Sequence, residues 1–194
     1  MKDLEAAGAA LRTGRLVVLP TDTVYGVGAL PRSRGGVAAI FAAKGRSEDK
    51  AIPVLGASIE DLADVVVFDD RAGALAERFW PGPLTLVMPR NPSWPYDLGG
   101  SDNSTIAVRV PRNPTALALL ERTGPLAVTS ANRSDEPAAT TVARARSALG
   151  DAVAVYLEGG VCDEVPSSVV SVVGGIKMLR DGPVSLDAVY KVTE

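Results

Sequence analysis

Short apolar runs alternate with helix-patterned segments along the chain, and this alternation constrains the fold more than any other feature. Strand-like runs such as "RLVVLP" (15–20), "LTLVMP" (84–89) and "STIAVRVP" (104–111) are bounded by Pro, Gly, Asn and Ser. Between such runs lie segments like "NPTALALLERTG" (113–124), with Asn before the first turn and Gly at the exit. Helices covering a twisted sheet follow from this order. Some strand connections are too short for a crossover helix, so we predict an α/β fold with a mixed parallel/antiparallel sheet flanked by helices.

The same patterns place the remaining elements. A chain of 194 residues without an internal repeat suits one compact domain, and 46% hydrophobic residues can supply its core. Further strands are predicted at 51–55, 65–68, 125–132, 152–157, 167–173 and 176–180. Further helices are predicted at 3–14, 37–46, 58–65, 69–80 and 141–150.

Composition excludes several classes of function. There is no histidine, which removes mechanisms built on an imidazole base and the common zinc sites. The single cysteine, Cys162, forbids an intrachain disulfide and favours a reducing compartment. A net charge of −3 argues against a protein that coats nucleic acid. The N-terminal segment is charged and no apolar run reaches membrane-spanning length, so we expect a cytoplasmic protein.

Hydroxyls and cations recur where apolar runs stop. Taken one at a time, these stretches have plain structural explanations, such as a capped turn or a solvated helix end. Taken together, they have the composition of an oxyanion or nucleotide pocket, and open α/β sheets bind ligands at strand ends. The sequence has neither a Walker-type GxxxxGK[ST] motif nor a GxGxxG motif. The stretches are "PTDTVYG" (20–26), "KGRSEDK" (44–50), "FWPGPLTLVM" (79–88), "STIAVRVP" (104–111) and "VTSAN" (128–132).

Two of these stretches leave alternatives open. Lys44 and Arg46 can complement a helix C-terminus, which does not account for Lys50, or all three cations can surround a polyphosphate. Arg109 either points outward from its strand or points inward, where it needs an anion from the protein or from a ligand. Thr105 lies four residues before Arg109 and therefore on the same face of the strand.

The ordered set "PTDTVYG", "KGR…DK", "PGPLT", "VRVP", "TSAN" and "SSVV…LR.G" resembles the threonylcarbamoyl-AMP synthase family. The resemblance spans roughly residues 5–185. It implies a YrdC-like fold with a central concave cavity, in the form with a single domain over residues 1–194. "NRSDEP" has Asp135 where that family usually has glycine, and Leu55 stands where some members have histidine.

The resemblance also implies an activity and a set of site residues. Such nucleotidyltransferases join L-threonine, bicarbonate and ATP, release pyrophosphate, and serve tRNA threonylcarbamoyladenosine modification. Lys44 and Arg46 would face the phosphates as the catalytic pair. The expected ATP contacts are Arg46, Lys50, Thr105, Ser130, Asn132, Ala138 and Arg180. The expected threonine contacts are Thr23, Arg109, Val128 and Ser167.

The implied partners are L-threonine, bicarbonate and ATP, with Mg²⁺ held mainly through phosphates and no metal ligands from the protein. tRNA would be served indirectly, through a threonylcarbamoyl-transferase machinery. The main alternative is a paralogue of the same fold that binds double-stranded RNA or nucleotide and has little synthase activity. A second alternative is the carbamoyl-adenylate domain of hydrogenase-maturation proteins, which usually belongs to a much longer chain.

Overall fold

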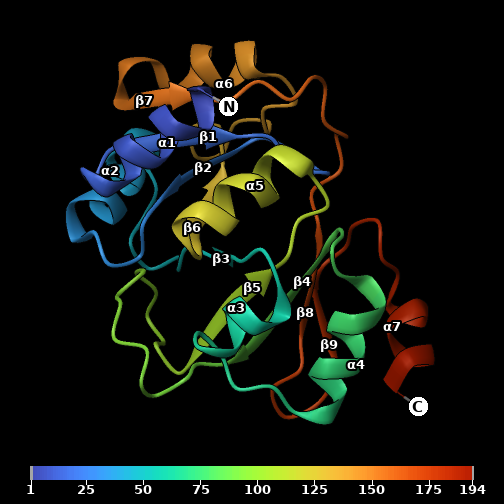
Figure 1. Cartoon of the computed structure of the whole chain (residues 1–194). Helices are drawn as coiled ribbons and strands as arrows, with labels where there is room; N and C mark the ends of the chain where they lie inside the picture. Colours follow the sequence, from blue (N-terminus) through green and yellow to red (C-terminus); the bar gives the residue numbers. More distant parts are fainter. Residues whose placement is uncertain (1, 194) are drawn as a thin grey trace.

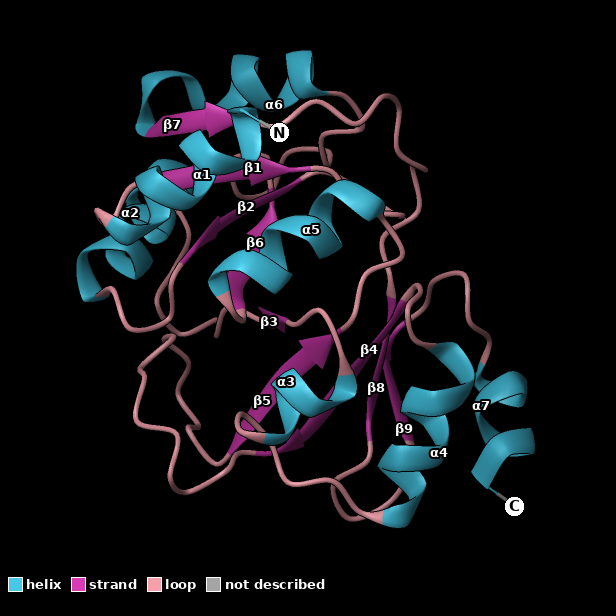
Figure 2. Ribbon diagram, viewed as in Figure 1, coloured by secondary structure: helices cyan, strands magenta, loops and turns pink. Residues whose placement is uncertain are grey.

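The computed structural model describes residues 2–193 as an α/β fold with one nine-stranded sheet (Figures 1 and 2). Its longest helices have 11 residues, and none within the described part of the chain is long and apolar enough to cross a membrane. The helices are α1 (Lys2–Arg12), α2 (Arg34–Lys44), α3 (Ile59–Ala63), α4 (Asp70–Phe79), α5 (Pro114–Thr123), α6 (Val142–Leu149), η1 (Gly150–Ala152) and α7 (Leu186–Thr193). The strands are β1 (Leu16–Leu19), β2 (Gly26–Ala29), β3 (Val54–Leu55), β4 (Leu84–Pro89), β5 (Thr105–Arg109), β6 (Leu126–Ser130), β7 (Val153–Tyr156), β8 (Ser168–Ser171) and β9 (Lys177–Arg180).

The sheet is mixed, as predicted. Its strand order is β7-β1-β2-β6-β3-β5-β4-β8-β9. Three neighbouring pairs are parallel, namely β1–β7, β3–β5 and β4–β8, and the other pairs are antiparallel. The two-residue strand β3 joins a group of strands around β1, β2 and β6 to a second group around β4, β5 and β8, and the groups run in different directions (Figure 2).

Both faces of the sheet are buried around β1. Val17 and Leu19 pack into a cluster with α1 and α5, whereas Leu16 and Val18 belong to a larger cluster that includes α2, α4 and α6. A strand buried on both faces is uniformly apolar, which explains the unbroken run "LVVL".

The predicted strand at 65–68 is wrong. The amides of Val65 and Val66 both donate to the carbonyl of Leu62, so the turn that ends α3 continues into this segment. The pairing described there is an isolated bridge between Val66 and Arg90. Val65 and Val66 are buried, and their apolar character therefore reflects core packing beside the end of β4.

The sequence patterns missed β2, α7 and the short helix η1. β2 has the sequence "GVGA", and glycine is unfavourable in strands. A Cβ atom on Gly26 would lie 2.6 Å from the Cγ1 atom of Val128 on the neighbouring strand β6. Glycine is therefore required because the side chain of a residue on the neighbouring strand lies too close for a Cβ atom. Local sequence propensities do not reveal such a contact.

Candidate functional site

A cavity of about 270 Å³ lies where the polar strand ends converge. Its wall combines the turn before β2, the segment after α2, and residues of β3, β4, β5, β6, β8 and β9. The lining residues are Thr21, Thr23, Val24, Tyr25, Gly26, Arg46, Pro53, Leu55, Thr85, Ala107, Arg109, Val128, Thr129, Ser130, Ala138, Pro166, Ser167, Val169 and Arg180.

Eight of the twelve residues expected at the site line this cavity. They come from distant parts of the chain, as a site built at strand ends requires. They are Thr23, Arg46, Arg109, Val128, Ser130, Ala138, Ser167 and Arg180. The other four, Lys44, Lys50, Thr105 and Asn132, are not in its wall.

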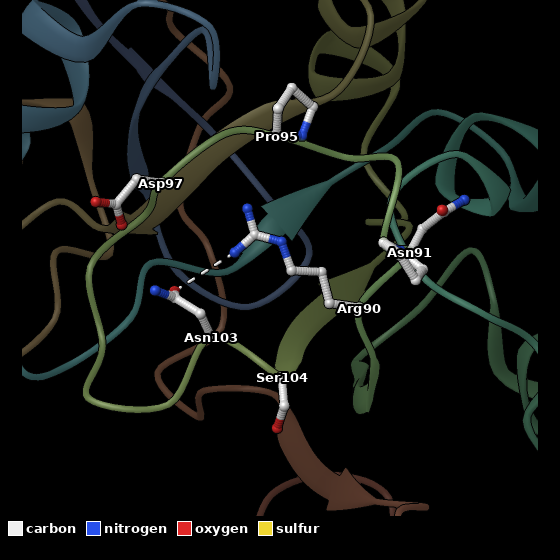
Figure 3. A pocket seen from close by; sticks show the side chains of 7 residues that line it. Arg90, Asn91, Pro95, Asp97, Asn103 and Ser104 are labelled. Atoms are coloured by element: carbon white, nitrogen blue, oxygen red, sulfur yellow. Dashed lines mark hydrogen bonds between the residues drawn. The ribbon is translucent and has the colours of Figure 1, made fainter.

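A larger cavity of about 600 Å³ lies elsewhere, against the loop after β4 (Figure 3). It is lined by Arg90, Asn91, Pro92, Pro95, Asp97, Asn103 and Ser104. The guanidinium of Arg90 there already donates to carbonyls of the loop itself, including that of Trp94. We assign the candidate site to the smaller cavity, because convergent cations and hydroxyls mark a binding site better than volume does.

Arg109 of β5 points inward and is 5% exposed. Its Nη2 atom lies 2.5 Å from the Oδ1 atom of Asp22, its Nη1 donates to Thr23 Oγ1 at 2.9 Å, and its Nε donates to the carbonyl of Gly82 at 2.8 Å. The protein therefore supplies the anion that an inward arginine needs. A guanidinium has five N–H groups, so two remain for a ligand, one on each terminal nitrogen.

The turn "PTDTVYG" is organised by Thr21. Its hydroxyl accepts from the amides of Thr23 and Val24 and donates to the carbonyl of Val24 at 2.6 Å. This arrangement fixes Thr23, which is 2% exposed and whose Oγ1 accepts from Arg109. The hydrogen of the Thr23 hydroxyl remains for Thr21, 3.1 Å away, or for a ligand in the cavity.

Asp22 and Thr85 are polar residues of this region that sequence reasoning missed. The Oδ2 atom of Asp22 is buried and has no hydrogen-bond partner among residues 2–193. Thr85 of β4 shares a hydrogen bond of 2.8 Å with the hydroxyl of Ser167. The sequence signal for Asp22 was a carboxylate between two threonines, together with an arginine inside an apolar strand that needed an anion.

Arg180 and Ser167 form a second polar cluster in the wall. The Nε and Nη2 atoms of Arg180 donate to the carbonyl of Ser167 at 3.0 and 2.9 Å, and Nη2 also donates to its hydroxyl at 3.1 Å. Burial lowers the pKa of Arg180 from its usual value. The Nη1 atom of Arg180 has no bond in this cluster, so the arginine can hold Ser167 and still donate to an anion.

The three basic side chains at the end of α2 and in the segment after it lie in three different environments. Arg46 lines the cavity, and its Nε and Nη2 atoms donate to the carbonyls of Lys50 and Ala51 at 3.0 Å each. Lys50 is exposed. Lys44 is 3% exposed, and its Nζ atom donates to the carbonyls of Ser130 and Asn132 at 2.5 Å each. Lys44 therefore holds the end of β6 from behind the cavity wall.

Burial, with a smaller effect from Arg46, lowers the pKa of Lys44 from 10.5 to about 8. Between pH 8 and pH 10.5 the unfolded chain then binds a proton that the folded chain has released, so stability rises with pH. We expect the free energy of unfolding of the wild type, relative to Lys44→Met, to increase by on the order of 3 kcal/mol across this window. Urea unfolding of both proteins at several pH values measures the difference. A constant difference would show that Lys44 keeps its proton.

Asn132 and Thr105 are not in the cavity wall. The strand β6 ends at Ser130, and the side chain of Asn132 turns away to donate to the carbonyls of Arg133 and Glu136. Thr105 is half-buried at the start of β5, away from the end where Arg109 lies. A neighbouring cavity of about 580 Å³ is lined by Asn132 and shares Ala138 with the first cavity.

The loop after Asn132 contains a left-handed residue. Asp135 has a φ of +66°, the conformation that glycine adopts most readily, and it is the one non-glycine residue with positive φ among those described. Aspartate tolerates this conformation better than most residues. The loop can therefore form with Asp135 at the position where the resemblance leads one to expect glycine.

The model of the Sua5/YciO/YrdC family, described as "Telomere recombination", matches residues 9–182 of the chain. A putative threonylcarbamoyl-AMP synthase from Mycobacterium tuberculosis is 41% identical over 98% of this chain and 89% of its own length. The threonylcarbamoyl-AMP synthase of Bacillus subtilis is 36% identical over 96% of this chain and 55% of its own length.

Among solved structures, that of P. abyssi Sua5 complexed with L-threonine superposes with a TM-score of 0.92. The two are 36% identical, and the match covers 97% of this chain and 56% of the P. abyssi protein. The chain thus spans about half the length of the P. abyssi and B. subtilis proteins and most of the length of the mycobacterial one.

Proposed function

The chain belongs to the Sua5/YciO/YrdC family, and on that premise we propose that it is a threonylcarbamoyl-AMP synthase. The reaction joins L-threonine, bicarbonate and ATP and releases pyrophosphate. The observation that carries the proposal is the convergence of Arg46, Arg109 and Arg180 with the hydroxyls of Thr23 and Ser167 around one cavity. A protein of this family 36% identical to the chain has been solved with L-threonine bound, which supports threonine as a substrate.

The threonine is proposed to lie against the Arg109 side of the cavity. The two remaining N–H groups of Arg109 can bind its carboxylate, because a guanidinium pairs with a carboxylate through two parallel hydrogen bonds. The hydroxyls of Thr23 and Ser167 also lie in this cavity. The first is hydrogen-bonded to Arg109 and the second to Arg180. Val128 lies in the same wall, and its backbone is proposed to contact the threonine.

ATP is proposed to lie against Arg46, Ser130 and Arg180. Two arginines can stabilise the charge on the phosphates, and the hydroxyl of Ser130 adds a donor. The nucleoside would extend past Ala138 toward Asn132, where the second cavity begins. The sequence led us to expect Lys44 to face the phosphates. We propose instead that Lys44 positions Ser130, by donating to its backbone carbonyl. Lys50 and Thr105 would meet only the outer parts of the nucleotide.

The chemistry needs fixed charges more than a general base. Carboxylation of the threonine amine by bicarbonate releases water and gives a carbamate, whose oxygen anion is the nucleophile. Attack on the α-phosphorus breaks its bond to the bridging oxygen, and pyrophosphate leaves with the electron pair. Arginines around the phosphates stabilise the charge that moves onto the departing group. A chain without histidine can therefore carry out the reaction.

Mg²⁺ is proposed to arrive with ATP. Among the described residues that line the cavity none is an aspartate or glutamate, so phosphate oxygens and water would supply the ligands. The product would then pass its threonylcarbamoyl group to a tRNA adenosine through a separate transfer machinery.

The test is pyrophosphate release from ATP, with bicarbonate present throughout. We expect release that requires L-threonine and is not supported by serine or glycine. ATP binding without threonine-dependent release would reject the synthase and favour a paralogue with another acceptor.

A further inference from the structure

Arg90 ties together the loop that follows β4. Its side chain points into the space enclosed by the loop 91–104, and Pro95 and Asp97 lie on the part of the loop across from it (Figure 3). The guanidinium donates to the carbonyls of Trp94 and Tyr96 and lies 3.4 Å from the Oδ1 atom of Asn103. It also stacks over the ring of Trp94, with 5.1 Å between the Cζ atom and the ring centroid. One side chain thus fixes both arms of the loop.

The tip of this loop packs against the basic segment that follows α2. The amide of Gly100 donates to the carbonyl of Glu48 at 2.7 Å, and the amide of Ile52 donates to the carbonyl of Leu98 at 3.0 Å. Both tip glycines have positive φ, +73° for Gly99 and +98° for Gly100. A Cβ atom on Gly100 would lie 2.9 Å from the Cβ atom of Ala51, so the two backbones are in close contact.

The basic segment, in turn, holds Arg46. The carbonyls of Lys50 and Ala51 accept from the Arg46 guanidinium. The loop tip touches Ala51 itself and bonds to Glu48 and Ile52, which flank these two acceptors. A displacement of the loop tip would therefore move the acceptors that orient a cation of the cavity wall.

We propose that Arg90 is a positioning residue for the nucleotide site, acting through the loop 91–104 on the segment 46–51 and so on Arg46. The inference rests on the proposed function, because it assigns Arg46 to the phosphates of ATP. Arg90 itself is not in the cavity wall. Its effect should fall on ATP rather than on threonine, since the Arg109 cluster shares no hydrogen bond with the loop.

An arginine is required for this role. Three acceptors on two arms of the loop are met by three nitrogens in one plane, while the same plane stacks on Trp94. A lysine could supply the positive charge but not the planar fork. Arg90→Lys therefore separates positioning from simple electrostatic attraction of ATP.

The experiment compares pyrophosphate release by the wild type, Arg90→Ala, Arg90→Lys and Arg78→Ala. Arg78 is the matched control, because it is an exposed arginine over an aromatic ring, that of Phe79, on helix α4. We expect both Arg90 variants to raise the KM for ATP about tenfold while the KM for threonine stays within about twofold. Amide exchange at Gly100 and Ile52 should accelerate in the Arg90 variants only, which checks the loop without using activity.

Recovery of the wild-type KM by Arg90→Lys, or unchanged exchange at Gly100 and Ile52 in Arg90→Ala, would overturn the inference. If Arg90→Ala loses the fold, Gly100→Ala replaces it, because that change strains the same contact from the loop tip and is expected to raise the KM for ATP alone. A wild type without threonine-dependent release would instead reject the proposed function, and the exchange data would still decide whether Arg90 orders the segment 46–51.

Discussion

Arg109→Met is expected to abolish threonine-dependent pyrophosphate release and to lower the free energy of unfolding by about 3–5 kcal/mol. The substitution leaves the buried carboxylate of Asp22 without its ion-pair partner, and Gly82 and Thr23 lose the donor that they share. It also removes the two N–H groups proposed to bind the threonine carboxylate. Urea unfolding measures the first effect, and pyrophosphate release at saturating ATP measures the second.

The double variant Asp22→Leu/Arg109→Met separates these two effects. Replacing both members of a buried ion pair by apolar residues is often neutral or stabilising, so the stability lost in Arg109→Met should largely return. Activity should not return, because no guanidinium is present for the substrate. A double variant that regains threonine-dependent release would show that Arg109 is needed only to neutralise Asp22.

The sequence predicted where polar groups gather but not how they pair. Strand ends are local features, so the apolar runs and the hydroxyls after them could be recognised one by one. The ion pair between Asp22 and Arg109 joins residues 87 positions apart, and its existence depends on the strand order β2-β6-β3-β5. The same reasoning left the partner of Arg109 open, because nothing local distinguishes an anion of the protein from one of the ligand.

Lys44 shows a local rule overridden by tertiary structure. A lysine in the last turn of a helix is usually solvated and complements the helix dipole. Here Gly45 adopts the left-handed conformation that ends α2, and Lys44 is buried against the carbonyls at the end of β6, some 86 positions away. The predicted strand at 65–68 failed for a related reason, since buried residues that make only an isolated bridge produce the same apolar pattern as a strand.

Arg46→Ala is expected to lower kcat/KM for pyrophosphate release by about 10²–10³-fold. Two N–H groups of the side chain donate to the carbonyls of Lys50 and Ala51, which leaves three N–H groups for phosphate oxygens. Its burial lowers the pKa of Arg46 from the usual value, yet an arginine remains charged at neutral pH, so the stabilisation is available throughout the working range. Initial rates at varied ATP and fixed threonine give the change.

The fold should survive this substitution, because Arg46 is only half-buried in a surface segment and its contacts are hydrogen bonds to two carbonyls that water can replace. Arg34→Ala, at the opposite end of α2 and exposed, is the matched control and should retain wild-type kinetics. Arg46→Lys should recover little activity, since a lysine cannot hold both carbonyls and still present a planar fork to the phosphates. Near-normal turnover in Arg46→Ala would show that Arg46 does not bind the phosphates. Of the two arginines proposed to contact ATP, only Arg180 would then stabilise the charge on the departing pyrophosphate.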